Sequence, residues 1–131
     1  MRGPYFAFLI GVLVVTSCKE KKEQSDTGVL SAEAFDDAIL STSNEIILDV
    51  RTPEEFSEGH IPNAMLINLR DEDFKTQIRK IDKQLPIYVY CASGVRSDKA
   101  ATILKDEGFK QVYVLENGLN DWRASNKEIV R

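Results

Sequence analysis

The sequence has little of several residue types that define whole classes of protein. Its 131 residues include two cysteines, one histidine and one tryptophan. Cys18 lies in a polar stretch and Cys91 ends an apolar run, and a disulfide framework needs a denser set than this pair. One histidine among scattered carboxylates gives none of the spacings of a metal site, so we expect no metal and no other cofactor.

Positive charge is outnumbered by negative charge and is not concentrated. The chain has 17 Lys and Arg against 21 Asp and Glu, a formal net charge of −4, and its basic residues cluster only in the short segment 19–22. A nucleic-acid surface needs a basic stripe, so we expect no nucleic-acid partner. The remaining composition, 43% hydrophobic and 29% charged, is that of one ordinary globular domain, and we expect a monomer.

A long hydrophobic run is missing, but a short one opens the chain. Eleven apolar residues from Tyr5 to Val15 follow the basic start at Arg2 and precede two small residues and Cys18. As a helix this run would span about 16 Å, against about 30 Å of membrane hydrocarbon. It therefore predicts a cleaved secretory leader over residues 1–17 rather than a membrane-spanning anchor.

The segment Val15-Thr16-Ser17-Cys18 resembles a bacterial lipobox. The resemblance implies cleavage before Cys18, lipidation of that cysteine, and export across the inner membrane to a membrane-anchored position on the periplasmic side or at the cell surface. Several acyl chains give stable attachment, whereas one is marginal. The alternative is a plain signal peptide with an accidental cysteine. Residues 18–27 have no apolar period and predict a flexible tether, which leaves residues 28–131 for the folded domain.

Strand patterns alternate with helix patterns along the rest of the chain. Apolar and β-branched runs predict five strands, at 29–30, 45–50, 64–67, 87–90 and 111–115. Caps and apolar residues at helical spacing predict five helices: over 32–40, from Thr52-Pro53, from a cap at Asp71, from the loop after Cys91 to Gly108, and around Leu119 and Trp122. This alternation predicts an α/β fold, a mainly parallel sheet with helices on both faces and Trp122 in the core.

The stretch from Pro86 to Ser97 carries the strongest chemical signal. Residues 87–90 are apolar throughout, as in a strand covered on both faces, and Cys91 follows at the carboxyl end, where open α/β sheets place their ligands. The next three residues are small: Ala92, Ser93 and Gly94. They let backbone N–H groups converge, and with Arg96 and a helix start they would lower the pKa of the Cys91 thiol and make it a nucleophile. The alternative is an inert buried cysteine.

These residues resemble a known family. The run Cys91-Ala92-Ser93-Gly94-Val95-Arg96-Ser97 is similar to the Cys-x-x-Gly-x-Arg-Ser loop of single-domain rhodaneses, and segments 48–56 and 59–64 match two more family segments in order. The resemblance covers residues 28–126. It implies the rhodanese-like fold and a sulfurtransferase that takes a sulfane sulfur from a donor such as thiosulfate, holds it as a persulfide, and passes it to cyanide or a thiol.

The resemblance also implies roles for the loop residues. Cys91 is the nucleophile, and the substrate-binding residues are Ala92, Ser93, Gly94, Val95 and Arg96. Arg96 either binds an anionic donor through its planar fork or closes the loop through bonds to carbonyls, and the two roles are compatible. Ser93 or Ser97 either donates to the sulfur or caps the helix.

Four more polar residues come before the loop: Asp49, Arg51, Glu58 and His60. Sulfur transfer to and from a thiolate needs little proton shuttling, so we interpret them as structural. We expect Asp49 and Arg51 to order the turn after the second strand, and the segment around His60 to shape the entry to the third.

Two other functions stay open. A cysteine phosphatase also combines a cysteine, an N–H cradle and an arginine, but such enzymes place one more residue in the loop than the four that separate Cys91 from Arg96. The other is a non-catalytic, membrane-tethered binding module, as some rhodanese-like domains are after losing their cysteine. The presence of Cys91 favours an enzyme.

Overall fold

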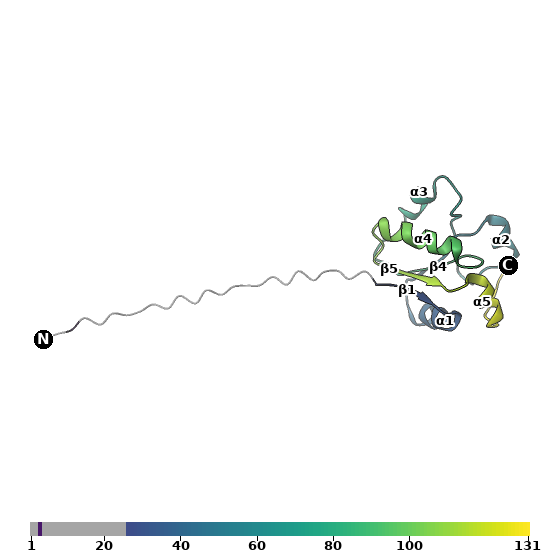
Figure 1. Cartoon of the computed structure of the whole chain (residues 1–131), viewed down its shortest axis with the longest axis horizontal. Coiled ribbons are helices and arrows are strands. Elements are labelled where there is room, and N and C mark those ends of the chain that lie inside the picture. Colours follow the sequence, from purple (N-terminus) through teal and green to yellow (C-terminus); the bar gives the residue numbers. More distant parts are fainter. Residues whose placement is uncertain (1–2, 4–25) are drawn as a thin grey trace.

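The structure is a computed structural model that describes Gly3 and residues 26–131. The rest of the predicted leader, Cys18, and residues 19–25 of the predicted tether lie outside the described residues. The described chain forms a five-stranded sheet in the order β1-β5-β4-β2-β3, and every neighbouring pair of strands is parallel. Helices cover both faces (Figure 1), so the predicted α/β fold is confirmed.

Strands and helices alternate along the described chain, as predicted. The strands are β1 (Asp26–Leu30), β2 (Ile46–Asp49), β3 (Met65–Leu66), β4 (Ile87–Tyr90) and β5 (Gln111–Leu115). The helices are α1 (Ala32–Ser41), α2 (Pro53–Glu58), α3 (Phe74–Ile78), α4 (Val95–Asp106) and α5 (Gly118–Ala124).

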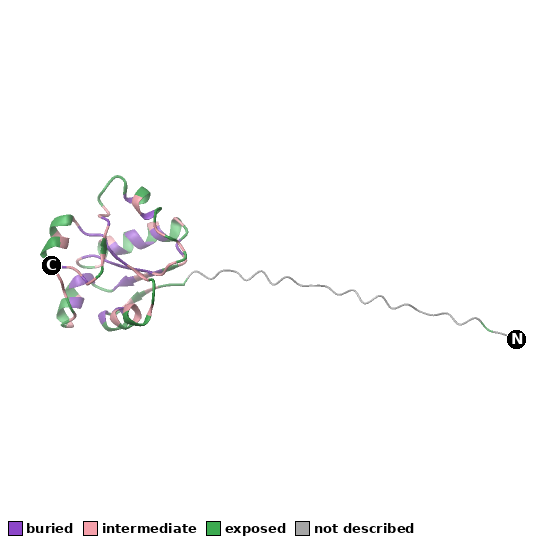
Figure 2. Ribbon diagram, turned by 180° about the vertical axis from the view of Figure 1, so that it is seen from behind, coloured by how far each residue is buried: buried purple, intermediate pink, exposed green. Residues whose placement is uncertain are grey.

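Two hydrophobic clusters fill the two faces of the sheet. Helices α3 and α4 cover one face, where Ile78 and Leu104 are fully buried. Helices α1 and α5 cover the other, where the rings of Phe35 and Trp122 meet edge to face at 6.1 Å. Figure 2 shows the buried residues along the strands and on the inner sides of the helices. Trp122 is a core residue, as predicted, and its indole N–H donates to the Glu128 carbonyl at 2.8 Å.

The strand β1 begins earlier than predicted. The Asp26 N–H donates to the Lys110 carbonyl at 2.9 Å, and the Asp26 carboxylate accepts a bond from the Tyr113 hydroxyl at 2.7 Å. Strand β1 thus begins two residues before residue 28, where the sequence analysis starts the folded domain, and the domain limits themselves stay a prediction. Polar residues in an exposed edge strand carry no apolar period by which the strand could be recognised.

Three of the predicted helix ends are confirmed. Ser31 and Thr52 cap α1 and α2 with their side chains. At the end of α4, Gly108 has φ of 94°, and the Phe109 N–H donates back to the Leu104 carbonyl at 3.1 Å. This is the 6→1 bond of a Schellman ending, in which glycine takes the left-handed position without strain.

The predicted cap at Asp71 is wrong. Helix α3 begins at Phe74 after Asp73, and neither aspartate provides a side-chain cap. The Asp71 carbonyl, rather than its carboxylate, accepts the bond from the Phe74 N–H at 3.1 Å. A short turn therefore comes before the helix and takes the place of the cap.

The parallel arrangement brings two chain segments to one edge of the sheet. β2 and β4 are neighbours, so the turn after Asp49 and the loop after Tyr90 both leave the sheet at its carboxyl edge. The Val50 N–H continues the pairing to the Tyr90 carbonyl at 3.1 Å. Asp26 begins β1 at the opposite, amino edge.

Candidate active site

Cys91 follows β4 directly and is fully buried. The Gly94 N–H donates to its Sγ at 3.1 Å, and the Ser97 hydroxyl oxygen lies 3.4 Å from the same sulfur. The single proton of the Ser97 hydroxyl is donated either to the Gly94 carbonyl, at 3.0 Å, or to the sulfur once the thiol has lost its own proton. The loop therefore wraps the sulfur with polar hydrogens, as the sequence predicts.

The surroundings lower the pKa of the Cys91 thiol. Burial is the largest influence and acts upward, but it is outweighed by the Ser97 hydroxyl and by the N–H groups of Ser97, Ser93 and Gly94. These donors stabilise negative charge on sulfur, and the amino end of α4 adds its dipole. The site thus favours the nucleophilic thiolate form.

Helix α5 is joined to the cysteine loop by backbone hydrogen bonds. The N–H groups of Leu119 and Asn120 donate to the carbonyls of Cys91 and Ala92, at 2.8 and 3.1 Å. Gly118 makes this approach possible, because a Cβ there would overlap the Cys91 and Ala92 backbone, and its φ is 59°. The sequence analysis missed Gly118. Its signal is the Asn-Gly pair at 117–118, a common turn dipeptide.

Arg96 is bound by a carboxylate from another helix. Its two terminal nitrogens donate to the two carboxylate oxygens of Glu55 in α2, at 2.7 and 2.9 Å. The guanidinium of Arg96 thus bonds to a carboxylate, whereas the loop-closing role considered from the sequence uses backbone carbonyls. The Arg96 hydrogen bond is also the main reason that the pKa of Glu55 falls to about 2, so this carboxylate is ionised at neutral pH.

Glu55 is a second residue that the sequence analysis missed. It is the third residue of α2, and its N–H donates to the Thr52 hydroxyl at 3.3 Å while its carboxylate reaches back to Thr52. This capping box fixes the side chain where Arg96 meets it. The capping pattern is visible in the sequence, but a partner 41 residues away is not.

Asp49 and Arg51 form a buried ion pair at the end of β2. The Arg51 Nη2 lies 2.7 Å from the Asp49 carboxylate and also donates to the Gly59 carbonyl at 2.7 Å. The Arg51 N–H donates to the same carboxylate at 2.9 Å. These bonds order the turn after β2, as predicted.

His60 has structural contacts of the kind expected. Its ring stacks on Phe56 with centroids 3.7 Å apart, and its Nδ1 lies 3.0 Å from the Phe56 carbonyl. Its backbone pairs with Val130 at 2.9 Å in both directions. The exposed Glu58 uses its carbonyl to accept a bond from Arg131 at 3.0 Å. These contacts tie the carboxyl-terminal residues to the segment before β3.

A hollow of about 270 Å³ adjoins the cysteine loop. Ser93, Gly94 and Val95 line one side of it, and the acidic residues Asp98 and Glu116 line another part. It is open space beside the loop, and neither Cys91 nor Arg96 is among the residues that line it.

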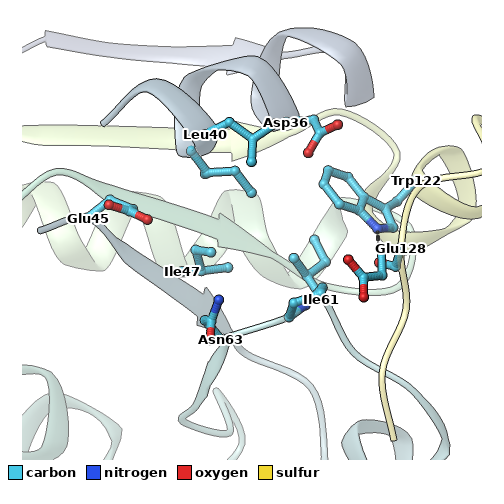
Figure 3. Close-up of a pocket in the computed structure, with 10 residues that line it drawn as sticks. Asp36, Leu40, Glu45, Ile47, Ile61, Asn63, Trp122 and Glu128 are labelled. Atoms are coloured by element: carbon cyan, nitrogen blue, oxygen red, sulfur yellow. Dashed lines mark hydrogen bonds between the residues drawn. The ribbon is translucent and has the colours of Figure 1, made fainter. Parts of the chain in front are cut away.

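A second hollow, of about 300 Å³, lies on the face covered by α1 and α5 (Figure 3). Ile47, Ile61 and Trp122 form its apolar wall, and Asp36, Glu45 and Glu128 add carboxylates. No residue of the cysteine loop lines this second hollow.

Within Gly3 and residues 26–131, no three His, Cys, Asp or Glu side chains gather as a metal site would require. Among these same residues, no helix is long and apolar enough to cross a membrane.

The fold and the site define a class of protein. It is a parallel α/β domain in which a cysteine follows the central strand and lies in a loop whose backbone N–H groups surround the sulfur. Residues 31–125 match the Rhodanese-like domain family, and the chain belongs to that family.

Three relatives show how widely this domain is used. A Bacillus subtilis protein named as a candidate sulfur carrier, YrkF, is 37% identical over 75% of this chain and 52% of its own length. The thiosulfate sulfurtransferase GlpE of Coxiella burnetii is 37% identical over 60% of this chain and 72% of its own. The tRNA uridine(34) hydroxylase of Buchnera aphidicola is 37% identical over 62% of this chain but only 27% of its own. The chain thus spans about half of YrkF and about a quarter of the hydroxylase.

Among solved structures, a rhodanese-like domain protein from Staphylococcus aureus superposes with a TM-score of 0.65 at 30% identity. The match covers 72% of this chain and 90% of that one. The arrangement of strands and helices is therefore that of a whole rhodanese-like domain.

Proposed function

We propose that the protein is a sulfurtransferase that works through a persulfide on Cys91. One observation carries the proposal: Sγ lies 3.1 Å from the Gly94 N–H and 3.4 Å from the Ser97 hydroxyl, in a loop that lowers the thiol pKa. Similarity to a protein named as a thiosulfate sulfurtransferase supports the same reaction.

In the first half-reaction the Cys91 thiolate attacks the sulfane sulfur of the donor. A new S–S bond forms, the donor's own bond to that sulfur breaks, and the electron pair leaves with the donor, as sulfite when the donor is thiosulfate. The N–H groups that stabilise the thiolate then face the negative charge of the outer persulfide sulfur. Because Cys91 is fully buried, side chains of the loop must move aside to admit the donor.

In the second half-reaction a thiol or cyanide attacks the outer sulfur and Cys91 leaves as a thiolate. The donors of Gly94 and Ser97 stabilise that leaving group, because they lower its pKa. The same cradle therefore serves both halves of the cycle, with no cofactor.

A thiosulfate-to-cyanide transfer assay on the wild-type protein and Cys91→Ser tests the proposal. We expect sulfur transfer by the wild type and its loss in the variant, because a serine hydroxyl is not ionised at neutral pH. Circular dichroism and thermal unfolding check that the variant folds. A folded Cys91→Ser protein with a tenth or more of the activity would contradict the persulfide route.

We also propose that the protein is a lipoprotein, anchored through Cys18 to a membrane on the periplasmic side or at the cell surface. The support for the anchor is the lipobox-like sequence. The direction of the sheet is compatible with it, because β1 begins at the amino edge, opposite the carboxyl edge that carries Cys91. We propose in addition that the protein acts as a monomer. A tether that enters at Asp26 would leave the site facing away from the anchor.

Metabolic labelling with a clickable palmitate, followed by fractionation, tests the anchor. We expect label and membrane association in the wild type and neither in Cys18→Ser. An unlabelled wild type, or a Cys18→Ser protein that is processed and stays in the membrane fraction, would contradict it. Light scattering after gel filtration of residues 26–131 gives the oligomeric state of the domain.

A further inference from the structure

The arginine of the cysteine loop is already paired with a carboxylate. Arg96 makes two parallel bonds with Glu55, at 2.7 and 2.9 Å, and the two side chains are only 21% and 31% exposed. The two guanidinium nitrogens of Arg96 that could bind an anionic donor are thereby occupied by the carboxylate of Glu55. The Arg96–Glu55 pair has no net charge, since Glu55 stays ionised at neutral pH.

The residues beside the loop are acidic rather than basic. Asp98 in the first turn of α4 and Glu116 after β5 both line the hollow next to Ser93–Val95. Among the described residues that line this hollow, there is no Lys and no Arg. An anion in this hollow therefore meets backbone N–H groups of the loop and the amino end of α4, beside two acidic side chains and no basic one.

This charge balance separates two kinds of sulfur donor. Thiosulfate is a dianion, so its attack by the Cys91 thiolate brings three negative charges together while Arg96 remains neutralised. An alkyl persulfide carries no charge as RSSH and one as RSS⁻. Its approach meets much less repulsion in a partly buried site, where charges are poorly screened.

We propose that Glu55 is a specificity-determining residue that withholds Arg96 from dianionic donors, so that the preferred sulfur donor is an alkyl persulfide rather than thiosulfate. The inference rests on the proposed sulfurtransferase function and names the donor class for that site. Glu55 acts through Arg96 and touches no reacting atom, so it is a positioning residue.

The reaction balances without a further reactant. The Cys91 thiolate attacks the outer sulfur of RSSH and forms the new S–S bond, and the bond between the two donor sulfurs breaks. The electron pair leaves with RS⁻, and the proton stays on the outer sulfur, which is now that of the Cys91 persulfide. The total charge is minus one before and after the step.

The experiment compares two donors on the full-length protein and on Glu55→Gln. The probes are thiosulfate and 2-hydroxyethyl persulfide generated in situ, with loading of Cys91 followed by rapid mass spectrometry. Glutamine keeps the shape and the capping contact of Glu55 but removes its charge. We expect the KM for thiosulfate to fall about tenfold in Glu55→Gln with kcat changed less than about twofold, as suits a freed bidentate cation. We expect kcat/KM for the persulfide to stay within about twofold.

A matched control is available just beyond the helix that begins with Val95 and Arg96. Glu107, the residue that follows α4, makes two bonds with Arg79, at 2.8 and 3.0 Å. Glu107→Gln therefore makes the same chemical change and breaks the same kind of pair about 16 Å further along the helix. We expect it to leave both donors unaffected. An equal gain for thiosulfate in this control would show that net charge, rather than Arg96, sets the preference, and would overturn the proposal.

A double variant tests whether the effect of Glu55 on thiosulfate acts through Arg96. Adding Arg96→Gln to Glu55→Gln should remove the gain for thiosulfate, because the gain comes from the freed guanidinium. A gain that persists in the double variant contradicts the proposal, as does a wild type that loads from thiosulfate more efficiently than from the persulfide. If neither donor places sulfur on Cys91 of the wild type, the proposed sulfurtransferase function is contradicted. If both donors load Cys91 but Glu55→Gln changes neither reaction, only the role of Glu55 is contradicted.

Discussion

Gly118 lies so close to the backbone carbonyl of Cys91 that no side chain fits between them. This approach lets α5 donate two backbone bonds to the start of the cysteine loop, from Leu119 and Asn120. Those bonds fix the carbonyls of Cys91 and Ala92, which leaves the N–H groups of the loop to turn towards the sulfur. A helix far along the chain from the nucleophile therefore shapes the nucleophile's environment.

Replacing Gly118 by alanine should damage both stability and activity. The new Cβ would overlap backbone atoms of Cys91 and Ala92, and the positive φ adds strain, so we expect a loss of at least about 2 kcal/mol in unfolding free energy. Gly28→Ala is the control, because nothing lies within 4 Å of a Cβ at that position. Urea unfolding and sulfur transfer measure the two effects. Wild-type stability in Gly118→Ala would show that the loop is not held in this way.

Ser97 should tune the reactivity of the thiol. Its hydroxyl is the strongest of the donors that lower the pKa of Cys91, so Ser97→Ala should raise that pKa. The rate of alkylation by iodoacetamide rises with pH as the thiolate forms, with a midpoint that we expect below the ordinary value of about 8.5 in the wild type. The midpoint should move upward in Ser97→Ala and stay in place in Ser41→Ala, an exposed serine bonded only within α1. An unchanged midpoint in Ser97→Ala would exclude its hydroxyl as the tuning group.

The Asp49–Arg51 pair should matter for folding more than for chemistry. Both side chains are almost fully buried, and Asp49→Asn would leave the Arg51 charge without its partner. Breaking a buried pair costs about 3 kcal/mol or more. Chemical unfolding should show this loss, while the folded fraction keeps its kcat. The exposed Asp71, whose carboxylate caps no helix, gives the control Asp71→Asn, and a cost below about 1 kcal/mol at Asp49 would contradict the structural role.

The Arg96–Glu55 pair should leave a signature in the acid stability of the domain. The pKa of Glu55 is about 2 in the folded state, against about 4.3 in an unfolded chain, so the pair stabilises the fold fully above about pH 5. That contribution is lost as the pH falls through about 2. The difference in unfolding free energy between the wild type and Glu55→Gln should therefore shrink from pH 5 to pH 2. If it stays constant, the carboxylate is not the group that titrates.

The sequence was sufficient for the features that depend on local patterns. A run of four apolar residues followed by Cys91 predicts a buried strand with the cysteine at its carboxyl end, and the structure has that arrangement. The Schellman ending at Gly108 likewise needs only its own turn. Alternation of strands and helices is enough to predict the parallel sheet.

Features that depend on long-range contact were missed for a physical reason. Glu55 is visible as a capping residue, but many of the chain's 17 basic residues could pair with it, and only the meeting of β2 and β4 at one edge selects Arg96. Gly118 reads as an ordinary turn glycine until α5 is packed against the loop. The start of β1 at Asp26 depends on its pairing with β5 rather than on its own polar residues.

The most direct test of the central claim is the mass of the peptide that contains Cys91 after the protein has met a sulfane-sulfur donor. The wild type is incubated with 2-hydroxyethyl persulfide or thiosulfate, freed of donor, digested without reductant and analysed by tandem mass spectrometry, with Cys91→Ser alongside. We expect one added sulfur atom on Cys91, its removal by cyanide with release of thiocyanate, and no addition in the variant. A Cys91 peptide that gains no sulfur from either donor, in a protein shown to be folded, would contradict it.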